Sequence, residues 1–185
     1  AVLDQLKSKG WIRSYGWSSE DRVKLSAFAE LSEGDAIQHP FNVLDQEASD
    51  IVELCERHHM TSINNAPLAM GLLSGKFQAS SVLPANDVRG AEHKWVRYFK
   101  DGKPVPQFLQ SLHAIAEILR SDGRSLVQGA LSWIWGKSDA TLPIPGLRTV
   151  KQVEEAAGAL EHGPLRKAQM EEIEQILLSL AKTSA

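Results

Sequence analysis

Short apolar stretches alternate with amphipathic segments along this 185-residue sequence. Aromatic and β-branched residues predict short strands over residues 12–17, 36–39, 61–65 and 142–144. Apolar residues at helical spacing predict helices over residues 3–9, 20–32, 46–59, 106–121, 125–136, 149–160 and 165–182. Gly10 is expected to end the first helix, and Asp45 is expected to cap the third. Strands and helices that alternate in this way favour parallel βα units in an α/β fold.

Four βα units are compatible with two architectures. They make half of an eight-unit barrel, which typically needs ~250 residues. A free half-barrel would leave two strand edges unpaired, which is unfavourable. An open, doubly wound sheet of four strands is the alternative, and the pattern alone leaves both open.

A long insertion separates the third predicted strand from the next helix. It covers residues 74–106, is rich in glycine, proline and basic residues, and shows no steady period, which is typical of a functional lid. Its expected basic face consists of Lys94, Arg97 and Lys100, interleaved with Trp95, Tyr98 and Phe99. Such a stretch can also bind single-stranded nucleic acid, but acidic residues dilute its charge, so we expect a lid and no nucleic-acid partner.

Composition and charge restrict the class of protein further. The sequence is 43% hydrophobic and 23% charged, as in an ordinary globular domain, and its formal net charge of −3 gives no attraction to acidic membranes. No apolar run approaches the ~20 residues that cross a bilayer. The single cysteine, Cys55, fits a reducing, cytoplasmic setting, and the adjacent His58 and His59 are poor partners for one metal. Residue 1 is alanine, so we expect the sequence to begin within a longer protein.

Four runs of residues resemble the aldo-keto reductases, eight-stranded barrels that transfer hydride from NADP(H) to carbonyl groups. Residues 67–76 (PLAMGLLSGK) resemble the loop after the family's seventh strand, and residues 144–149 (IPGLRT) resemble its eighth strand. Residues 38–45 (QHPFNVLD) and 10–19 (GWIRSYGWSS) are similar to its sixth and fifth strands. The resemblance implies the second half of a (β/α)8 TIM barrel, with a C-terminal helix, as one domain over residues 1–185.

The resemblance also implies an NADP(H) site at the carboxyl ends of the strands, where barrel enzymes bind ligands. At its nicotinamide end, Ser18 and Gln38 would pair with the carboxamide, which has both a donor and an acceptor. Two neighbours depart from the family pattern. Ser19 stands where the family usually has asparagine, and Asn65 where it often has a stacking tyrosine. All four remain in the expected site.

The phosphate end of the implied site draws on the two most specific runs. Gly71, Gly75 and Lys76 would approach the pyrophosphate, since glycine permits close backbone approach and lysine adds charge. Arg148 and Gln152 would hold the adenosine 2′-phosphate beside a helix N-terminus, which favours an anion. The remaining expected contacts are Leu68, Leu73 and Glu155, and Ala156 stands where the family often has asparagine for the adenine.

No residue of this sequence matches the family's proton-donating machinery. Reduction of a carbonyl needs a hydride donor and an acid, and in the family that acid is a tyrosine assisted by lysine, aspartate and histidine. The sequence has two tyrosines, Tyr15 and Tyr98. Neither has the aspartate that the family places five residues earlier, where Gly10 and His93 stand instead. We therefore expect no catalytic residue here.

Three interpretations follow from the sequence. In the first, the chain is the C-terminal portion of an NADPH-dependent carbonyl reductase, inactive until an N-terminal half supplies the missing residues. In the second, it is a non-catalytic half-barrel that binds the cofactor and pairs with a second copy or another protein, which would hide both sheet edges. In the third, it is a structural remnant that binds nothing.

Overall fold

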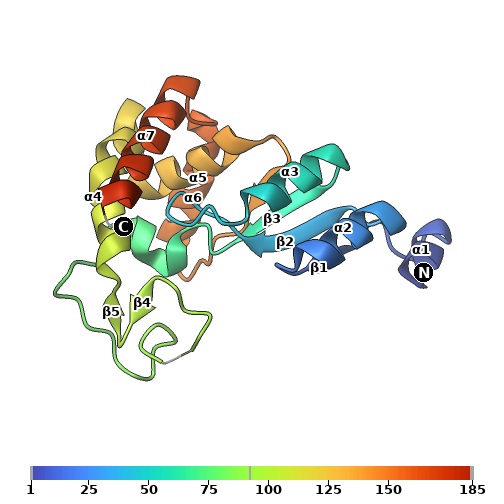
Figure 1. Ribbon diagram of the computed structural model, residues 1–185, viewed down its shortest axis with the longest axis horizontal. Coiled ribbons are helices and arrows are strands. Elements are labelled where there is room, and N and C mark those ends of the chain that lie inside the picture. The colour runs from blue at the N-terminus through green and yellow to red at the C-terminus, as the bar shows by residue number, and fades with distance from the viewer. Residues whose placement is uncertain (1, 92, 184–185) are drawn as a thin grey trace.

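The fold is built on parallel strands that pair in the order of the chain (Figure 1). The structure, a computed structural model, describes residues 2–91 and 93–183. Its main sheet has four strands in the order β1-β2-β3-β6, with the bounds β1 (Gly16–Ser18), β2 (Ala36–Pro40), β3 (Thr61–Asn65) and β6 (Thr141–Pro143). A doubly wound sheet reverses its strand order at a switch point. No reversal occurs among the described strands, so the sheet is not doubly wound and its strand order resembles that of a barrel.

Each predicted helix is present. Their bounds are α1 (Val2–Ser8), α2 (Arg22–Leu31), α3 (Ser49–Arg57), α4 (Pro106–Arg120), α5 (Leu126–Lys137), α6 (Val150–His162) and α7 (Lys167–Thr183). Capping fixes three of the starts: the Asp21 carboxylate accepts the Lys24 N–H at α2, while Ser125 and Thr149 begin capping boxes at α5 and α6. Within the described residues, no helix is long and apolar enough to cross a membrane.

The two faces of the sheet differ in what covers them. On one face, Ile37, His39, Ser62 and Asn64 are fully or almost fully buried. The Ser62 hydroxyl there bonds the His39 Nε2 at 2.8 Å and accepts the Asn64 Nδ2–H at 2.9 Å. The opposite face is less covered: its side chains on β2 and β3 are half-buried, and Leu142 of β6 is 50% exposed. The sheet is therefore packed on one side and open on the other.

Two sequence predictions fail at the edges of elements. β1 begins at Gly16 rather than residue 12 and includes Ser18, because the Tyr15 N–H donates to the Asp35 carboxylate instead of to a neighbouring strand. Asp45 does not cap α3, which begins at Ser49 without a side-chain cap. The Asp45 carboxylate instead forms an ion pair with Arg97 and accepts a hydrogen bond from the Tyr98 hydroxyl.

The insertion at residues 74–106, called the lid below, is more ordered than its sequence predicts. It contains the antiparallel pair β4 (Phe99–Lys100) and β5 (Lys103–Pro104), and the 3-10 helix η1 (Ala69–Ser74) leads into it (Figure 1). Tyr98 and Phe99 are each 3% exposed, so they pack in the core and are not available to stack on bases. The predicted continuous basic face is wrong, since Arg97 pairs with carboxylates.

Helix α5 lies unusually close to α4, because a glycine stands at their contact. A Cβ at Gly129 would overlap the carbonyl oxygen of Leu119. Buried residues of both helices, among them Ile115, Leu119 and Trp133, belong to the same core cluster. This contact holds the helical layer behind β3 and β6.

We expect Gly129→Ala to lower the free energy of unfolding by about 2 kcal/mol, the usual cost of overpacking a core. Urea unfolding followed by tryptophan fluorescence measures it. Gly146→Ala is the matched control, since a Cβ there would meet no described atom within 4 Å. Equal unfolding midpoints for the two variants would contradict the close α4–α5 packing.

Candidate functional site

A cavity of about 880 Å³ lies at the carboxyl ends of β3 and β6. The loop after β3, lid residues 86–89 and the β6–α6 loop with the first turns of α6 form its walls. Six residues of the expected cofactor site line it: Leu68, Gly71, Lys76, Arg148, Gln152 and Glu155. The structure thus brings together residues from two sequence runs about 75 positions apart, as the parallel winding of the sheet requires.

The loop after β3 is a tight, strained turn. Three non-glycine residues have left-handed backbones, with φ of 49° at Ala66, 48° at Ala69 and 54° at Met70. Gly71 follows at 92°, a value that strongly favours glycine. Non-glycine residues in this region cluster at functional sites, where the surrounding structure maintains the strain.

The turn uses several of its own backbone donors. The N–H groups of Gly71 and Leu73 both donate to the Leu68 carbonyl, at 2.8 and 3.2 Å. The Leu73 side chain is fully buried in the core and does not line the cavity. Gly75, at φ 74°, ends η1 with its N–H on the Leu72 carbonyl and shapes the turn from outside the cavity. Positive charge for a ligand must therefore come mainly from side chains.

Arg89 of the lid supplies such a charge, and sequence reasoning missed it. Its guanidinium holds the Asp87 carboxylate through Nη2 at 2.6 Å and Nε at 2.8 Å. Its Nη1 donates to the Met70 carbonyl at 3.2 Å, which fastens the lid to the strained turn. The spacing of Asp87 and Arg89 was the available signal, but the docking on Met70 depends on tertiary structure.

Aromatic rings support two of the cations. The Arg89 guanidinium lies 5.1 Å from the Phe77 ring centre and 5.8 Å from that of Phe99, and the Lys76 ammonium lies 4.9 Å from that of Phe77. Contacts of this geometry are attractive and restrict the side chains. The hydrogen bonds from Arg89, and more weakly the charge of Arg148, hold the pKa of the Asp87 carboxyl well below its usual range.

The N-terminus of α6 forms the opposite wall. The Gln152 Oε1 accepts the N–H groups of Arg148 and Thr149, at 2.8 and 3.3 Å, and the Thr149 hydroxyl accepts the Gln152 N–H. Gln152 was expected to contact a phosphate, but its oxygen is used to cap the helix. The capping fixes the exposed Arg148 at the positive end of the helix dipole.

Four expected residues lie outside the cavity, on the neighbouring strands and the loop after β1. Ser18 pairs with Gln38, and Gln38 with Ile63, so their side chains share the open face with Asn65. Adjacent strands lie about 5 Å apart, which places Gln38 about 5 Å and Ser18 about 10 Å across from β3. The Ser19 hydroxyl oxygen accepts the Asp21 N–H at the start of α2.

Neither tyrosine of the chain lines the cavity. Tyr15 precedes β1, at the amino-terminal end of the sheet, and donates its hydroxyl to Asp4. Tyr98 is 3% exposed, and burial raises the pKa of its hydroxyl. The Asn42 amide donates to the Tyr98 oxygen at 2.7 Å and to the Ala66 carbonyl at 3.0 Å, so it connects the loop after β2 to the lid and to the turn after β3.

The single cysteine is also separate from the site. Cys55 is fully buried on α3, and burial raises the pKa of its thiol to about 11. A neutral, enclosed thiol is unreactive, so Cys55 has a packing role in the core.

A parallel sheet wound in chain order, with a cation-lined cavity at the carboxyl ends of its strands, resembles the side on which barrel proteins bind ligands. The sequence matches the model of the Aldo/keto reductase family over residues 1–178, and the chain belongs to this family.

Known proteins agree with this assignment. The chain is 28% identical over 165 residues to the chloroplastic pyridoxal reductase of Arabidopsis thaliana, covering 85% of this chain and 42% of that protein. It is 28% identical over 167 residues to aldo-keto reductase yakc [NADP(+)] of Schizosaccharomyces pombe, covering 86% and 47%. The solved glycerol dehydrogenase AKR11B4 of Gluconobacter oxydans shares the fold, with a TM-score of 0.78, 21% identity, and coverage of 95% and 52%. The chain spans about half the length of the relatives it matches.

Replacement of Asp87 tests the lid contact. We expect Asp87→Asn to lower the free energy of unfolding by about 1–2 kcal/mol, because a charge-assisted pair that is 15% and 22% exposed is lost. The folded-state pKa of Asp87 is depressed, so this contribution is complete above about pH 4 and declines as the pH falls below it. Urea unfolding at pH 7 and below pH 4 measures both effects, and a difference from wild type that does not shrink in acid would argue against the pair.

Asp139→Asn is the control for this experiment, because Asp139 is an exposed aspartate outside the lid and the cavity. Its unfolding free energy should stay within about 0.5 kcal/mol of that of wild type, as is usual for surface substitutions.

Proposed function

We propose that this chain is the cofactor-binding side of an NADP(H)-dependent carbonyl reductase. The observation that carries the proposal is the cavity at the ends of β3 and β6, where Lys76, Arg89 and Arg148 converge from three segments. A strained turn and a capped helix N-terminus hold them. This donor set is suited to a dinucleotide with several phosphate groups.

The phosphate end of the proposed site divides between two walls. Lys76 and Arg89 both lie against the turn at Gly71: a Cβ there would be in van der Waals contact with both, 3.6 Å from the Arg89 Nη1 and 3.9 Å from the Lys76 Cε. A pyrophosphate fits there. Arg148, on the α6 wall, would bind the 2′-phosphate through its planar fork, and Glu155 would border the adenine.

The nicotinamide end would lie over the open face of the sheet. Ser18 and Gln38 offer a hydroxyl and an amide to the carboxamide. The buried Oδ1 of Asn65 has no hydrogen-bond partner among the described residues, and an amide N–H of a ligand would satisfy it. The bound cofactor supplies the hydride. These residues would orient it, while Ser19 keeps the loop after β1 in shape.

The acid that protonates the substrate oxygen would come from outside this chain. Tyr15 and Tyr98 are both committed elsewhere, and the sheet presents β1 and β6 as edges and an uncovered face with Leu142 exposed. We propose that an N-terminal half of the same protein covers this face, completes the barrel and carries the catalytic tetrad. The 185-residue chain alone would then be inactive, and the whole protein would act in the cytoplasm.

The same edges also favour the second interpretation from the sequence. A second copy, or another protein with four strands, would satisfy β1 and β6 equally well. A dimer of this chain would bind cofactor without turnover, because both halves would lack the tetrad.

NADPH titration of the purified chain, followed by tryptophan fluorescence with NADH in parallel, tests the proposed function. We expect saturable binding that prefers NADPH, and about tenfold weaker binding for Arg148→Ala, equivalent to about 1.4 kcal/mol for one charged hydrogen-bonding partner. The preference for NADPH over NADH should shrink in this variant. NADH has no 2′-phosphate, so the loss of Arg148 weakens the binding of NADPH alone.

Lys151→Ala is the matched control, since Lys151 is an exposed cation on α6 outside the cavity. It should leave both affinities unchanged. Absence of NADPH and NADH binding at millimolar concentration would reject the proposed function for this chain and favour the structural remnant.

A further inference from the structure

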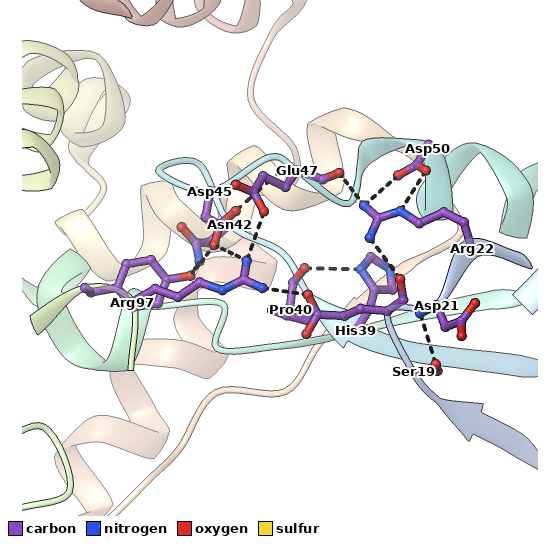
Figure 2. Close-up of polar contacts among 12 residues, drawn as sticks. Ser19, Asp21, Arg22, His39, Pro40, Asn42, Asp45, Glu47, Asp50 and Arg97 are labelled. Carbon is purple, nitrogen blue, oxygen red and sulfur yellow. Dashed lines mark hydrogen bonds and ion pairs between the residues drawn. The ribbon is translucent and has the colours of Figure 1, made fainter. Parts of the chain in front are cut away.

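One arginine of the lid contacts both loops that follow β1 and β2. Figure 2 shows Arg97 reaching from the lid into a group of carboxylates. Its Nη2 lies 2.7 Å from the Glu20 Oε2, and its Nη1 lies 3.1 Å from the Asp45 Oδ2 and 3.3 Å from the Glu47 Oε2. Glu20 follows Ser19 directly, while Asp45 and Glu47 belong to the loop between β2 and α3. A single guanidinium therefore binds carboxylates that lie 50 to 77 residues before it in the sequence.

A second arginine holds the backbone of two of these acidic residues. Arg22 donates its Nη1 to the Glu20 carbonyl at 2.9 Å and its Nη2 to the Glu47 carbonyl at 2.7 Å (Figure 2). Its Nε is paired with Asp50 at 3.0 Å. The backbones of Glu20 and Glu47 are thus fixed from α2, and their side chains meet the lid in a prearranged position.

The electrostatic balance of this cluster depends on Arg97. Four carboxylates, those of Glu20, Asp45, Glu47 and Asp50, face two guanidinium groups, and Asp50 is paired with Arg22. Loss of Arg97 would leave the other three carboxylates close together without their counter-charge. Like charges at this range repel, so the lid would lose an attraction and the two loops would also separate.

We propose that Arg97 is a positioning residue, which fastens the lid to the loops after β1 and β2 and so sets the distance between the two ends of the site. This inference rests on the proposed function for the meaning of the two ends. Residues 86–89 of the lid line the proposed phosphate end of the site. Ser18 and Ser19, at the proposed nicotinamide end, directly precede Glu20. The ion pairs of Arg97 with Glu20, Asp45 and Glu47, called the strap below, are partly accessible to solvent, since the Arg97 side chain is 35% exposed.

Hydrogen exchange of the free protein, read by mass spectrometry on lid peptides covering residues 93–97, tests the strap without any ligand. Arg97→Gln should speed exchange about tenfold at low ionic strength, the factor that about 1.4 kcal/mol of lost interaction gives. Wild type should approach that rate when salt rises from about 0.01 M to about 1 M, where the Debye length falls from about 30 Å to about 3 Å. Arg97→Lys should recover part of the protection, because a lysine keeps the charge without the fork.

Lys100→Gln is the matched control, since Lys100 is an exposed cation of the same lid. Exchange that is unchanged in Arg97→Gln, or equally fast in Lys100→Gln, overturns the proposal. If Arg97→Gln does not fold, the double variant Glu20→Gln/Glu47→Gln replaces it, since both residues are exposed. About threefold faster exchange that responds less to salt than wild type supports the strap, because only the ion pair of Arg97 with Asp45 remains, and wild-type exchange overturns it.

The dissociation rate of NADPH then connects the strap to the site. We expect it to rise about tenfold in Arg97→Gln and to stay unchanged in Lys100→Gln, because a loosened lid releases its ligand faster. A wild-type chain that binds no NADPH would reject the proposed function, while the exchange experiment would still decide the role of Arg97.

Discussion

The parallel pairing of β3 between β2 and β6 is the constraint on which the whole site depends. Gln38 pairs with Ile63, and Ile63 with Leu142, so the carboxyl ends of all three strands meet at one edge. The loop after β3 and the β6–α6 loop therefore face each other, although the lid and two helices separate them in sequence. The same pairing leaves one face of the sheet open. The position of the cavity and the open face of the sheet both follow from the single direction in which the strands are wound.

Each cation of the cavity is restrained before any ligand arrives. Lys76 lies over Phe77, Arg89 is fixed by Asp87 and the Met70 carbonyl, and the backbone N–H of Arg148, just before the cap of α6, donates to Gln152. Restraint of this kind reduces the conformational entropy that binding would otherwise cost. Asp87 has two opposing effects: it orients Arg89, and it adds a negative charge beside an anion site. The hydrogen bonds from Arg89 are the main cause of the depressed pKa of Asp87, so the aspartate stays charged while it orients Arg89.

The fold was largely predictable from the sequence, and the failures have specific causes. Helix starts at Ser125 and Thr149 carry local signals in their side chains, and β3 was placed with its observed bounds. The cavity-lining half of the expected site came from a family resemblance that covers contiguous runs of residues. Arg97 was assigned to a solvent-exposed basic face because its partners lie 50 to 77 residues away. Asp45 was predicted to cap α3 because its actual partners, Arg97 and Tyr98, are equally distant in the sequence. Local pattern has no information on such contacts.

The lid is held by interactions of two different kinds, and this difference decides how it can move. Near the phosphate end, Arg89 is shielded by Phe77 and Phe99, and the ion pair with Asp87 is only 15% and 22% exposed. Near the nicotinamide end, Arg97 is more exposed and two of its three partners are surface carboxylates. Tyr98 and Phe99 follow Arg97 directly and are buried, so they keep the base of the lid in place when the ion pairs separate. We therefore expect the lid to loosen first beside the loops after β1 and β2, while residues 86–89 and their aromatic support remain closed.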